Sequence, residues 1–286
     1  MAKQFTVTDF FKRFPDDDSC LNHLMSIRFG FELDCPKCER HGKFSRITKQ
    51  PAFQCAWCSH HIHPMAGTPF QRSRTPLQKW FYAMYLFTTS RHGVPAKELQ
   101  RQLGVTYKCA WRMGHEIRKY MSDTDGNDGL SGHVEIDETY IGGKSNEVGR
   151  PGKDSKKTAV LGMVERNGDV MTHIVTDARR ATLIPLIEKH VEKGTRVSTD
   201  QLHAYKVLGG TGYDHKSVNH GAMEWVRGDT HTNSIEGVWS RLKNSIRGTH
   251  IHVSRKHLPK YLGEFEYRYN MRDNPEAMFS RLLLSF

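Results

Sequence analysis

Three acidic residues, Asp137, Asp200 and Glu236, have the types and positions from which they could do chemistry together. Asp137 lies inside a segment with the alternating pattern of a strand, where aspartate is disfavoured. Its carboxylate points away from the face of Val134 and Ile136, because successive side chains of a strand alternate. Asp200 ends a later short strand, Val-Ser-Thr-Asp, so its carboxylate would stand at the rim of a sheet.

Glu236 belongs to a predicted helix from Asn233 to Arg247. Apolar residues recur along one side of this helix, and Glu236, Lys243 and Arg247 share the other side. Lys243 follows Glu236 by seven residues, which is about two turns or roughly 10 Å of rise. The carboxylate could therefore bind a metal ion while the ammonium group holds a nearby phosphate.

A set of three carboxylates suits phosphodiester chemistry. Mg²⁺, or Mn²⁺ in its place, prefers oxygen ligands and keeps positions open for water and substrate. Two such ions activate an attacking water or 3′-hydroxyl and stabilise the leaving oxygen.

Each acid also has a purely structural interpretation. Glu236 could belong to a capping box with Asn233, Asp200 could cap the next helix, and Asp137 could pair with a basic residue. The order of the three acids along the predicted strands and helix, together with the positive charge of the chain, favours the catalytic interpretation.

Four of the six cysteines form two Cys-x-x-Cys pairs, Cys35 with Cys38 and Cys55 with Cys58, which are separated by 16 residues. This spacing is typical of a four-cysteine zinc site, in which each pair presents two thiolates to one tetrahedral Zn²⁺ ion. A redox pair or unrelated thiols are the alternatives, and two pairs at this spacing favour zinc. The ion would fold a segment that has little core of its own.

Other cysteines and histidines near this site have simpler interpretations. His60, His61 and His63 follow the second pair, but four thiolates already complete a closed site, so we interpret them as a polar patch. Cys20 and Cys109 are isolated, and we expect them to be small buried residues.

The chain carries a formal charge of +11 and has a pI near 9.4. Such an excess of Lys and Arg attracts polyanions, so nucleic acid is the leading partner, although a merely soluble basic protein would fit the charge as well. No apolar run is long enough to span a bilayer, and the N-terminus lacks the apolar region of a signal peptide, so we expect an intracellular protein. Five basic residues surround the cysteine pairs and favour phosphate contact: Lys37, Arg40, Lys43, Arg46 and Lys49.

The segment from Val94 to Met113 has the form of a helix-turn-helix. A turn at Gly104 separates two short helices, and Thr106 could cap the second of them. Two ordinary amphipathic helices joined by a glycine would look similar. We expect five residues to form the buried corner: Leu99, Leu103, Val105, Ala110 and Trp111. Three basic residues would then be available to DNA: Lys108, Arg112 and Arg118.

Composition divides the chain into zones that would position these residues. We expect a helical lead-in and zinc ribbon over residues 1–70 and a helical DNA-binding segment over 71–121. A linker rich in Asp, Gly and Ser follows over 122–132, and a catalytic domain occupies 133–286. The basic, Gly-rich stretch 142–157 is expected to be a mobile loop.

Alternating patterns predict the strands of the catalytic domain, and Asn167-Gly168 predicts a hairpin between the second and the third. The expected strands are Val134 to Ile141, Thr158 to Glu165, Val170 to Thr176 and Arg196 to Thr199. The expected helices are Ala181 to Lys193, Asn233 to Arg247 and Ser254 to Asn270.

The sequence resembles the bacterial insertion-sequence transposases, which join an N-terminal zinc ribbon to an Asp-Asp-Glu catalytic domain of ribonuclease H-like fold. The resemblance covers nearly the whole chain, and its motifs occur in a specific order. These motifs are the two cysteine pairs, Glu135-Ile-Asp-Glu-Thr-Tyr-Ile-Gly-Gly143, Ser198-Thr-Asp200, His231-Thr-Asn-Ser-Ile-Glu236 with Lys243, Gly248-Thr-His-Ile-His-Val-Ser254 and Tyr261-Leu-Gly-Glu-Phe-Glu-Tyr-Arg-Tyr-Asn270.

The resemblance implies an α/β fold with a mixed five-stranded sheet flanked by helices. It also implies that Asp137, Asp200 and Glu236 are the metal-binding triad and that Lys243 is a helper that contacts DNA. Glu135 and Glu138 are the alternatives for the first acid, although the motif places that role on Asp137.

The function implied by the resemblance is metal-dependent cleavage of double-stranded DNA at the terminal inverted repeats of a mobile element, followed by strand transfer into target DNA. Paired ends would require a homodimer or larger assembly, acting at the nucleoid in the bacterial cytoplasm. Two rival functions keep part of the pattern: a DNA-binding regulator without catalysis, and a metal-dependent nuclease without strand transfer.

Overall fold

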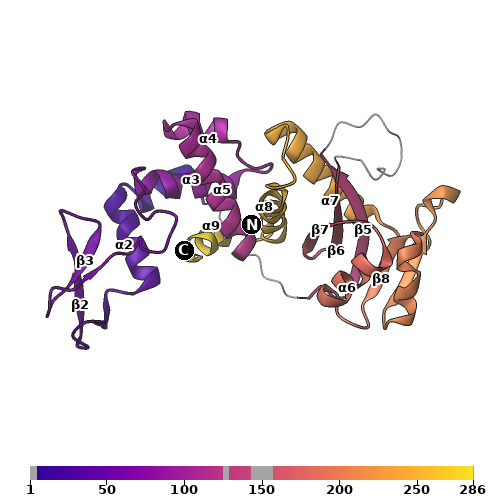
Figure 1. Cartoon of the computed structure of the whole chain (residues 1–286), viewed down its shortest axis with the longest axis horizontal. Coiled ribbons are helices and arrows are strands. Elements are labelled where there is room, and N and C mark those ends of the chain that lie inside the picture. The colour runs from indigo at the N-terminus through magenta and orange to yellow at the C-terminus, as the bar shows by residue number, and fades with distance from the viewer. Residues whose placement is uncertain (1–4, 125–128, 143–156, 286) are drawn as a thin grey trace. The chain divides into compact units, whose positions relative to one another are not determined.

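The computed structural model describes residues 5–124, 129–142 and 157–285, apart from the side chain of residue 276. The predicted mobile loop therefore lies almost entirely outside the described residues. The chain forms two compact units (Figure 1). Unit 1 comprises Met1–Ser90, Val94–Tyr120 and Asn274–Phe286, and unit 2 comprises Arg91–Gly93 and Met121–Asp273.

Unit 1 begins with two short helices, α1 (Val7–Arg13) and α2 (Asp17–Arg28). Each starts with a capping box, made by Thr6 and Asp16 respectively, in which the side chain accepts a hydrogen bond from a backbone N–H of the first turn. The predicted helical lead-in is confirmed. A four-stranded antiparallel sheet in the order β1-β2-β3-β4 follows: β1 (Glu32–Asp34), β2 (His41–Ile47), β3 (Ala52–Cys55) and β4 (His61–Ile62).

The remainder of unit 1 is helical. It contains α3 (Leu77–Thr89), α4 (Ala96–Leu103), α5 (Tyr107–Thr124) and α9 (Pro275–Leu284). Helix α9 packs against α3, because Phe279 lies beside Phe10 and Tyr85 in an aromatic cluster. The last helix of the chain thus belongs to unit 1, whereas the sequence pattern assigned it to the catalytic domain. The contact joins α3 and α9, which are far apart in the sequence, and no local pattern predicts it.

The expected helix-turn-helix has the predicted turn between α4 and α5. Gly104 adopts a left-handed φ of 60°, which glycine tolerates at the end of a helix, and Thr106 accepts a hydrogen bond from the N–H of Cys109 at 3.3 Å. Two expectations were wrong. Trp111 is 39% exposed rather than buried in the corner. Arg118 is 2% exposed and donates a hydrogen bond to the carbonyl of Val94, so it is not available to DNA.

Unit 2 is built on one mixed sheet in the order β7-β6-β5-β8-β9. Strands β5, β6 and β7 form an antiparallel meander, and β8 and β9 extend it in parallel with β5. This is the topology of a ribonuclease H-like fold, which the resemblance to the insertion-sequence transposases implied. The hairpin at Asn167, where φ is 62°, is also confirmed. The strands are β5 (His133–Ile141), β6 (Thr158–Glu165), β7 (Val170–Val175), β8 (Arg196–Asp200) and β9 (Asp214–Val218).

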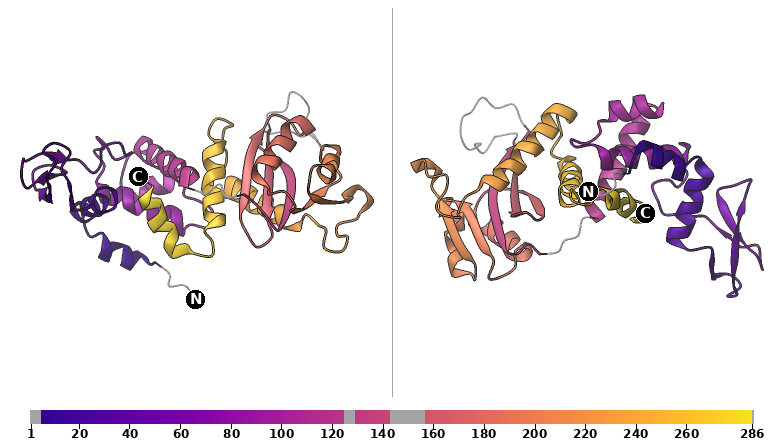
Figure 2. Two further views of the ribbon diagram at one scale, coloured as in Figure 1. Left: turned by 90° about the horizontal axis from the view of Figure 1, so that it is seen from below. Right: turned by 180° about the vertical axis from the view of Figure 1, so that it is seen from behind.

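Helices cover both faces of this sheet, as the views of Figure 2 show. Val134 and Ile136 of β5 belong to the core beneath α6, whereas Val160 and Val164 of β6 belong to the core beneath α7 and α8. Alternation along β5 therefore turns the side chain of Asp137 toward the α7 face. The helical elements are α6 (Arg180–His190), η1 (His203–Gly210), η2 (His220–Ala222), α7 (Asn233–Asn244), the wider-turned η3 (Ser245–His250) and α8 (Leu258–Asn270).

Candidate active site

The pairing of β5 with β8 makes Asp137 and Asp200 neighbours. The parallel register aligns Glu135 with Ser198 and Ile136 with Thr199, so the next positions on the two strands are Asp137 and Asp200. Aligned residues of parallel strands point to the same face of the sheet. Asp200 also accepts a hydrogen bond from the N–H of Leu202 at 2.9 Å, which holds its carboxylate at the strand end.

Glu135 fixes the start of α7 on the sheet. Its carboxylate is fully buried and accepts hydrogen bonds from the N–H groups of Ser234 at 2.7 Å and Ile235 at 3.1 Å. These are first-turn amides, where the helix dipole favours a negative charge. Arg166 donates to the same carboxylate at 2.7 Å and balances its charge. Glu135, an alternative for the first acid, is thus occupied as the cap of α7.

Capping by Glu135 leaves Glu236 for another role. The carboxylate of Glu236 is 48% exposed and accepts a hydrogen bond from the Thr232 hydroxyl at 3.0 Å. The capping-box interpretation of Glu236 is therefore wrong, because a residue distant in the sequence caps this helix.

A tryptophan connects α7 to Asp137. The Nε1–H of Trp239 donates to Asp137 Oδ2 at 3.0 Å. The indole lies directly over Gly162, the partner of Asp137 on β6, where a Cβ would stand only 2.4 Å from two of the ring carbons. Because Gly162 has no side chain, α7 can approach the sheet closely enough for this hydrogen bond. Sequence reasoning missed this function of Trp239 and Gly162.

The other two acids act electrostatically on Asp137. Burial, followed by the negative charge of Asp200 and, more weakly, of Glu236, raises the pKa of Asp137 from 3.8 to about 6. A buried carboxylate beside like charges favours a bound cation, since the cation would relieve both the burial and the repulsion. This donor set fits a hard divalent ion.

The three acids are not close enough together for one metal ion to be bound by all of them in the observed arrangement. In the part of the chain that the structure describes, only the four cysteines form a group of three or more His, Cys, Asp or Glu residues whose ligand atoms all lie within 4.8 Å of one another. At least one pair among the carboxylates of Asp137, Asp200 and Glu236 is therefore more than 4.8 Å apart.

Lys243 lies on α7 with Glu236, and its ammonium group interacts electrostatically with Asp137. Burial lowers the pKa of Lys243, the nearby Arg247 lowers it further, and the carboxylate of Asp137 opposes both effects. The ammonium group therefore lies within electrostatic range of Asp137. Arg247 itself is exposed on η3.

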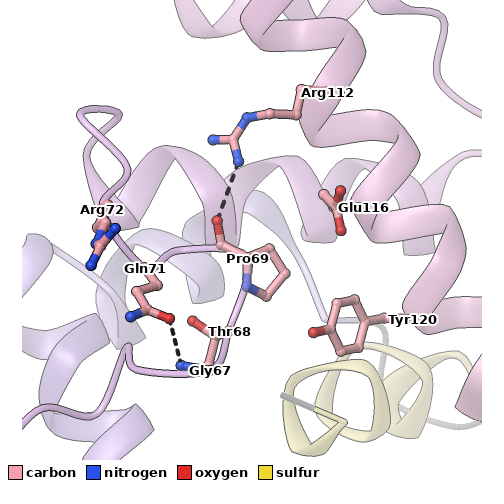
Figure 3. A pocket seen from close by; sticks show the side chains of 8 residues that line it. All are labelled: Gly67, Thr68, Pro69, Gln71, Arg72, Arg112, Glu116 and Tyr120. Atoms are coloured by element: carbon pink, nitrogen blue, oxygen red, sulfur yellow. Dashed lines mark hydrogen bonds between the residues drawn. The ribbon is translucent and has the colours of Figure 1, made fainter.

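The two basic residues predicted for the helix-turn-helix are on the surface of unit 1. Lys108 and Arg112 are both exposed on α5. The guanidinium of Arg112 lies over the Trp80 ring, 5.1 Å from its centroid, and donates to the carbonyl of Pro69 at 3.4 Å. It borders a pocket of about 520 Å³ between α5 and the segment 67–72 (Figure 3).

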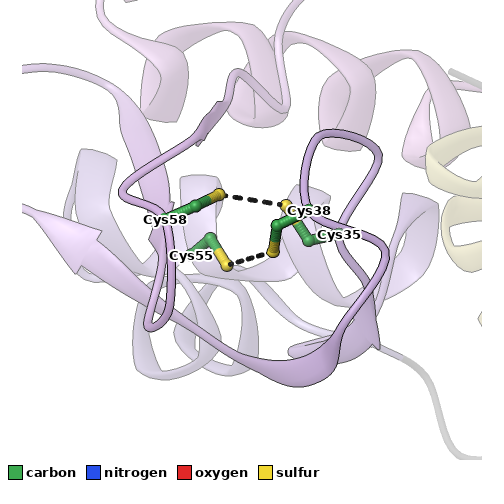
Figure 4. A group of neighbouring side chains, drawn as sticks. All are labelled: Cys35, Cys38, Cys55 and Cys58. Carbon is green, nitrogen blue, oxygen red and sulfur yellow. Dashed lines mark hydrogen bonds between the residues drawn. The ribbon is translucent and has the colours of Figure 1, made fainter.

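The four cysteine side chains of unit 1 converge, as Figure 4 shows. The Sγ atoms of Cys35 and Cys58 are 3.6 Å apart, and those of Cys38 and Cys55 are 4.0 Å apart. A tetrahedral zinc ion with Zn–S bonds of about 2.3 Å requires sulfur atoms about 3.8 Å apart, and a disulfide requires about 2.0 Å. The cluster fits one structural zinc ion.

Two family models match the chain. The model of the ISXO2-like transposase domain matches residues 129–270, and the model of the transposase zinc-ribbon domain matches residues 15–61. The chain belongs to this transposase family. The first match contains all three acids and Lys243, and the second contains all four cysteines.

Two curated relatives resemble this transposase. An uncharacterised protein in the transposable element ISH50 of Halobacterium salinarum is 27% identical over 281 residues, which cover 90% of this chain and 92% of the relative. An uncharacterised transposase-like protein of Haemophilus influenzae is 29% identical over 101 residues, which cover 35% of this chain and 80% of the relative.

Two solved structures match with low scores. A chain of the Mos1 strand transfer complex has a TM-score of 0.30 and 11% identity, with 71% of this chain and 76% of that chain covered. A chain of a pre-cleavage Mos1 transpososome has a TM-score of 0.29 and 14% identity, with 66% and 73% covered. Among the described residues of the transposase, every helix is too short or too polar to cross a membrane.

Proposed function

We propose that this transposase cuts DNA at the terminal inverted repeats of a mobile element and transfers the resulting 3′-hydroxyl ends into target DNA. Asp137, Asp200 and Glu236 would hold two Mg²⁺ or Mn²⁺ ions. The observations that carry the proposal are the strand register that makes Asp137 and Asp200 neighbours and the hydrogen bond from Trp239, on the helix of Glu236, to Asp137.

The spacing of the acids suits two ions better than one. Metal ions in two-metal sites lie about 3.5–4 Å apart, so the outer ligands of the pair need not approach each other closely. Asp137, between Asp200 on one side and α7 on the other, would contact both ions. When bound, the ions would activate the attacking hydroxyl and stabilise the leaving oxygen.

The basic residues would hold the substrate. Lys243 lies within electrostatic range of Asp137, and its ammonium group would contact a DNA phosphate next to the scissile bond, while Arg247 would contact the strand further along. We further propose that the zinc ribbon within residues 1–70 and the helical segment 71–121, with Lys108 and Arg112, grip the DNA. Residues 133–286 would contribute the catalytic acids after the linker 122–132. Two DNA ends would require a homodimer or larger assembly.

The test is a cleavage and joining assay on duplexes that carry the sequences bracketing the reading frame. The wild-type protein should cut and join them in Mg²⁺, and Asp137→Asn should lose at least 100-fold in rate while it retains DNA binding. Glu188→Gln, an exposed carboxylate on α6, serves as the matched control and should leave the rate unchanged.

The rival functions predict different results. A regulator without catalysis would bind these duplexes and leave them intact with every variant. A nuclease without strand transfer would cut labelled ends in a metal-dependent way, and no joined product would form.

A further inference from the structure

The loop between β9 and α7 exposes apolar side chains beside the candidate active site. Met223 is 83% exposed, Trp225 is 56% exposed and Val226 is 51% exposed. Large apolar side chains gathered on a soluble surface mark a binding site more often than an accident of folding. Residues 219–230 are named the platform loop below.

The platform loop holds these side chains in a defined conformation. The carboxylate of Glu224 accepts two hydrogen bonds from the Arg227 guanidinium, at 2.6 and 2.7 Å, and one from the N–H of Asn219 at 3.3 Å. Backbone bonds also join Arg227 and Thr230 in both directions. Met223 has a left-handed φ of 55°, which costs a residue with a side chain some energy. The loop therefore presents Trp225 from a fixed base.

A polar pocket joins the platform loop to the catalytic acids. Its volume is about 400 Å³, and Asp200, Gln201 and His203 line it on the β8 side, with Asn219 and His220 opposite them. This volume and this polar lining suit a sugar, whose oxygens can exchange hydrogen bonds with the amide and imidazole groups.

His220 connects the pocket to the exposed tryptophan. Its ring lies against that of Trp225, with centroids 4.7 Å apart and planes inclined by 33°. Its Nε2 is 3.9 Å from Glu236 Oε1, so the same imidazole also touches the third acid. A group stacked on Trp225 would therefore be separated from Glu236 only by the His220 side chain.

We propose that the platform loop binds a nucleobase that has left the DNA stack next to the scissile phosphate. The base stacks on the Trp225 indole, His220 supports the indole from its other side, and the pocket at Asp200 receives the sugar that carries the base. This inference rests on the proposed function and adds a subsite to it.

A nucleobase fits this place better than an apolar protein surface does. Trp225 lies against His220, which is 3.9 Å from Glu236, an acid of the proposed site of DNA cleavage, and an aromatic ring binds any unstacked base by its π-face. Base stacking on an aromatic side chain changes affinity by about 5- to 100-fold when the side chain is removed. An end whose bases are already unpaired should bind more tightly, because opening the duplex costs nothing there.

The test is a double-mutant cycle between the protein and the DNA. The protein carries Asp137→Asn, so that it binds without cutting, and the probes are terminal duplexes with either an unpaired base or an abasic nucleotide at each position near the cut. Trp225→Ala should weaken binding of the unpaired-base probe about tenfold and binding of the abasic probe less than twofold. Trp225→Phe should restore most of the loss.

Matched controls separate stacking from other occupants. Trp57→Ala removes another exposed tryptophan, in the zinc ribbon, and should weaken both probes equally if it has any effect. Equal losses for the two probes with Trp225→Ala, or full affinity with Trp225→Leu, would overturn the proposal in favour of a general apolar contact with a second copy or another protein. The cycle measures binding alone, so it stands even if the wild-type protein cuts no DNA end.

Discussion

At the scale of single residues, the site depends on an aspartate that is costly to ionise. Asp137 is shielded by the sheet and by Trp239, whose indole gives its carboxylate a hydrogen bond at 3.0 Å. This bond and a backbone hydrogen bond at Glu138 offset only part of the burial and of the repulsion from Asp200. The ionised form of Asp137 therefore costs the folded chain stability, and the proposed binding of a cation would relieve this cost.

Asp137→Asn should stabilise the metal-free protein at neutral pH. The pKa of Asp137 is raised from 3.8 to about 6, so its ionisation destabilises the folded chain. The contribution of the protonated carboxyl to the free energy of unfolding is fully present below pH 3.8 and is lost as the pH rises through 6. The shift corresponds to at most about 3 kcal/mol. Urea unfolding without added Mg²⁺ should show the variant more stable at pH 7.5, and equally stable near pH 4.

Glu188→Gln provides the comparison, since Glu188 is exposed on α6 and pairs with Lys193 at the surface. Its unfolding free energy should follow the wild type at both pH values within about 0.5 kcal/mol. An Asp137→Asn variant that is less stable than the wild type at pH 7.5 would contradict the assignment of a strained acid.

At the scale of elements, α7 is the part that completes the site, and it is attached to the sheet at two points. Glu135 caps its first turn from β5, and Trp239 reaches Asp137 from its second turn. The helix therefore cannot shift along the sheet without breaking buried hydrogen bonds, which are costly to leave unmade. This attachment positions Glu236 and Lys243.

Gly162→Ala should displace α7. A methyl group at Gly162 would lie 2.4 Å from carbons of the Trp239 ring, so the indole must move, and overpacking of this kind costs about 1–3 kcal/mol. Loss of the bond to Asp137 should also reduce cleavage by about tenfold or more. Thermal unfolding and the cleavage assay together measure both effects.

The control for this substitution lies on the helix itself. Gly237 has open space around its Cα, so Gly237→Ala should leave packing intact and stabilise α7 by up to about 1 kcal/mol. If Gly162→Ala proved as harmless as Gly237→Ala, the close approach of α7 to β6 would not matter for the site.

Most elements of unit 2 could be predicted because their patterns are local. Strand β6 was predicted with its observed bounds, Thr158–Glu165, since all but its last residue are buried. Strand β9 was missed, because Asp-His-Lys-Ser-Val is a half-exposed edge strand with little apolar alternation. The helix predicted from Asn233 to Arg247 ends at Asn244, where the wider turns of η3 begin. The spacing of apolar residues in the sequence does not distinguish these wider turns from an α-helix.

The site was predictable only in part for a related reason. Sequence patterns mark Asp137 and Glu236 as polar residues on structured elements, but the capping of α7 by Glu135 joins positions 99 residues apart. Trp239 fits a buried apolar stripe as well as it fits a hydrogen-bond donor. Contacts of this type depend on the register of strands and the docking of helices, which no local pattern encodes.

At the scale of the whole molecule, the two units have separate sources of stability. Unit 2 has two apolar clusters, one on each face of its sheet. The ribbon of unit 1 has short strands. Of the seven residues of β2, three are exposed, three are half-buried and only Phe44 is buried. A segment of this kind depends on a metal ion for much of its folding energy.

Removal of zinc should unfold the ribbon and spare the catalytic unit. In hydrogen exchange, the amides of β2 and β3 should lose protection by at least 100-fold after chelation, because four thiolates without an ion no longer connect the two Cys-x-x-Cys turns. The amides of β5 and β6 should remain protected, since their core contains no zinc ligand. Cys35→Ser should reproduce the pattern without a chelator, and Cys109→Ser, whose thiol contacts Thr75 away from the cluster, should not. Exchange that rises equally in both units would mean that the ribbon and the catalytic unit fold as one cooperative body.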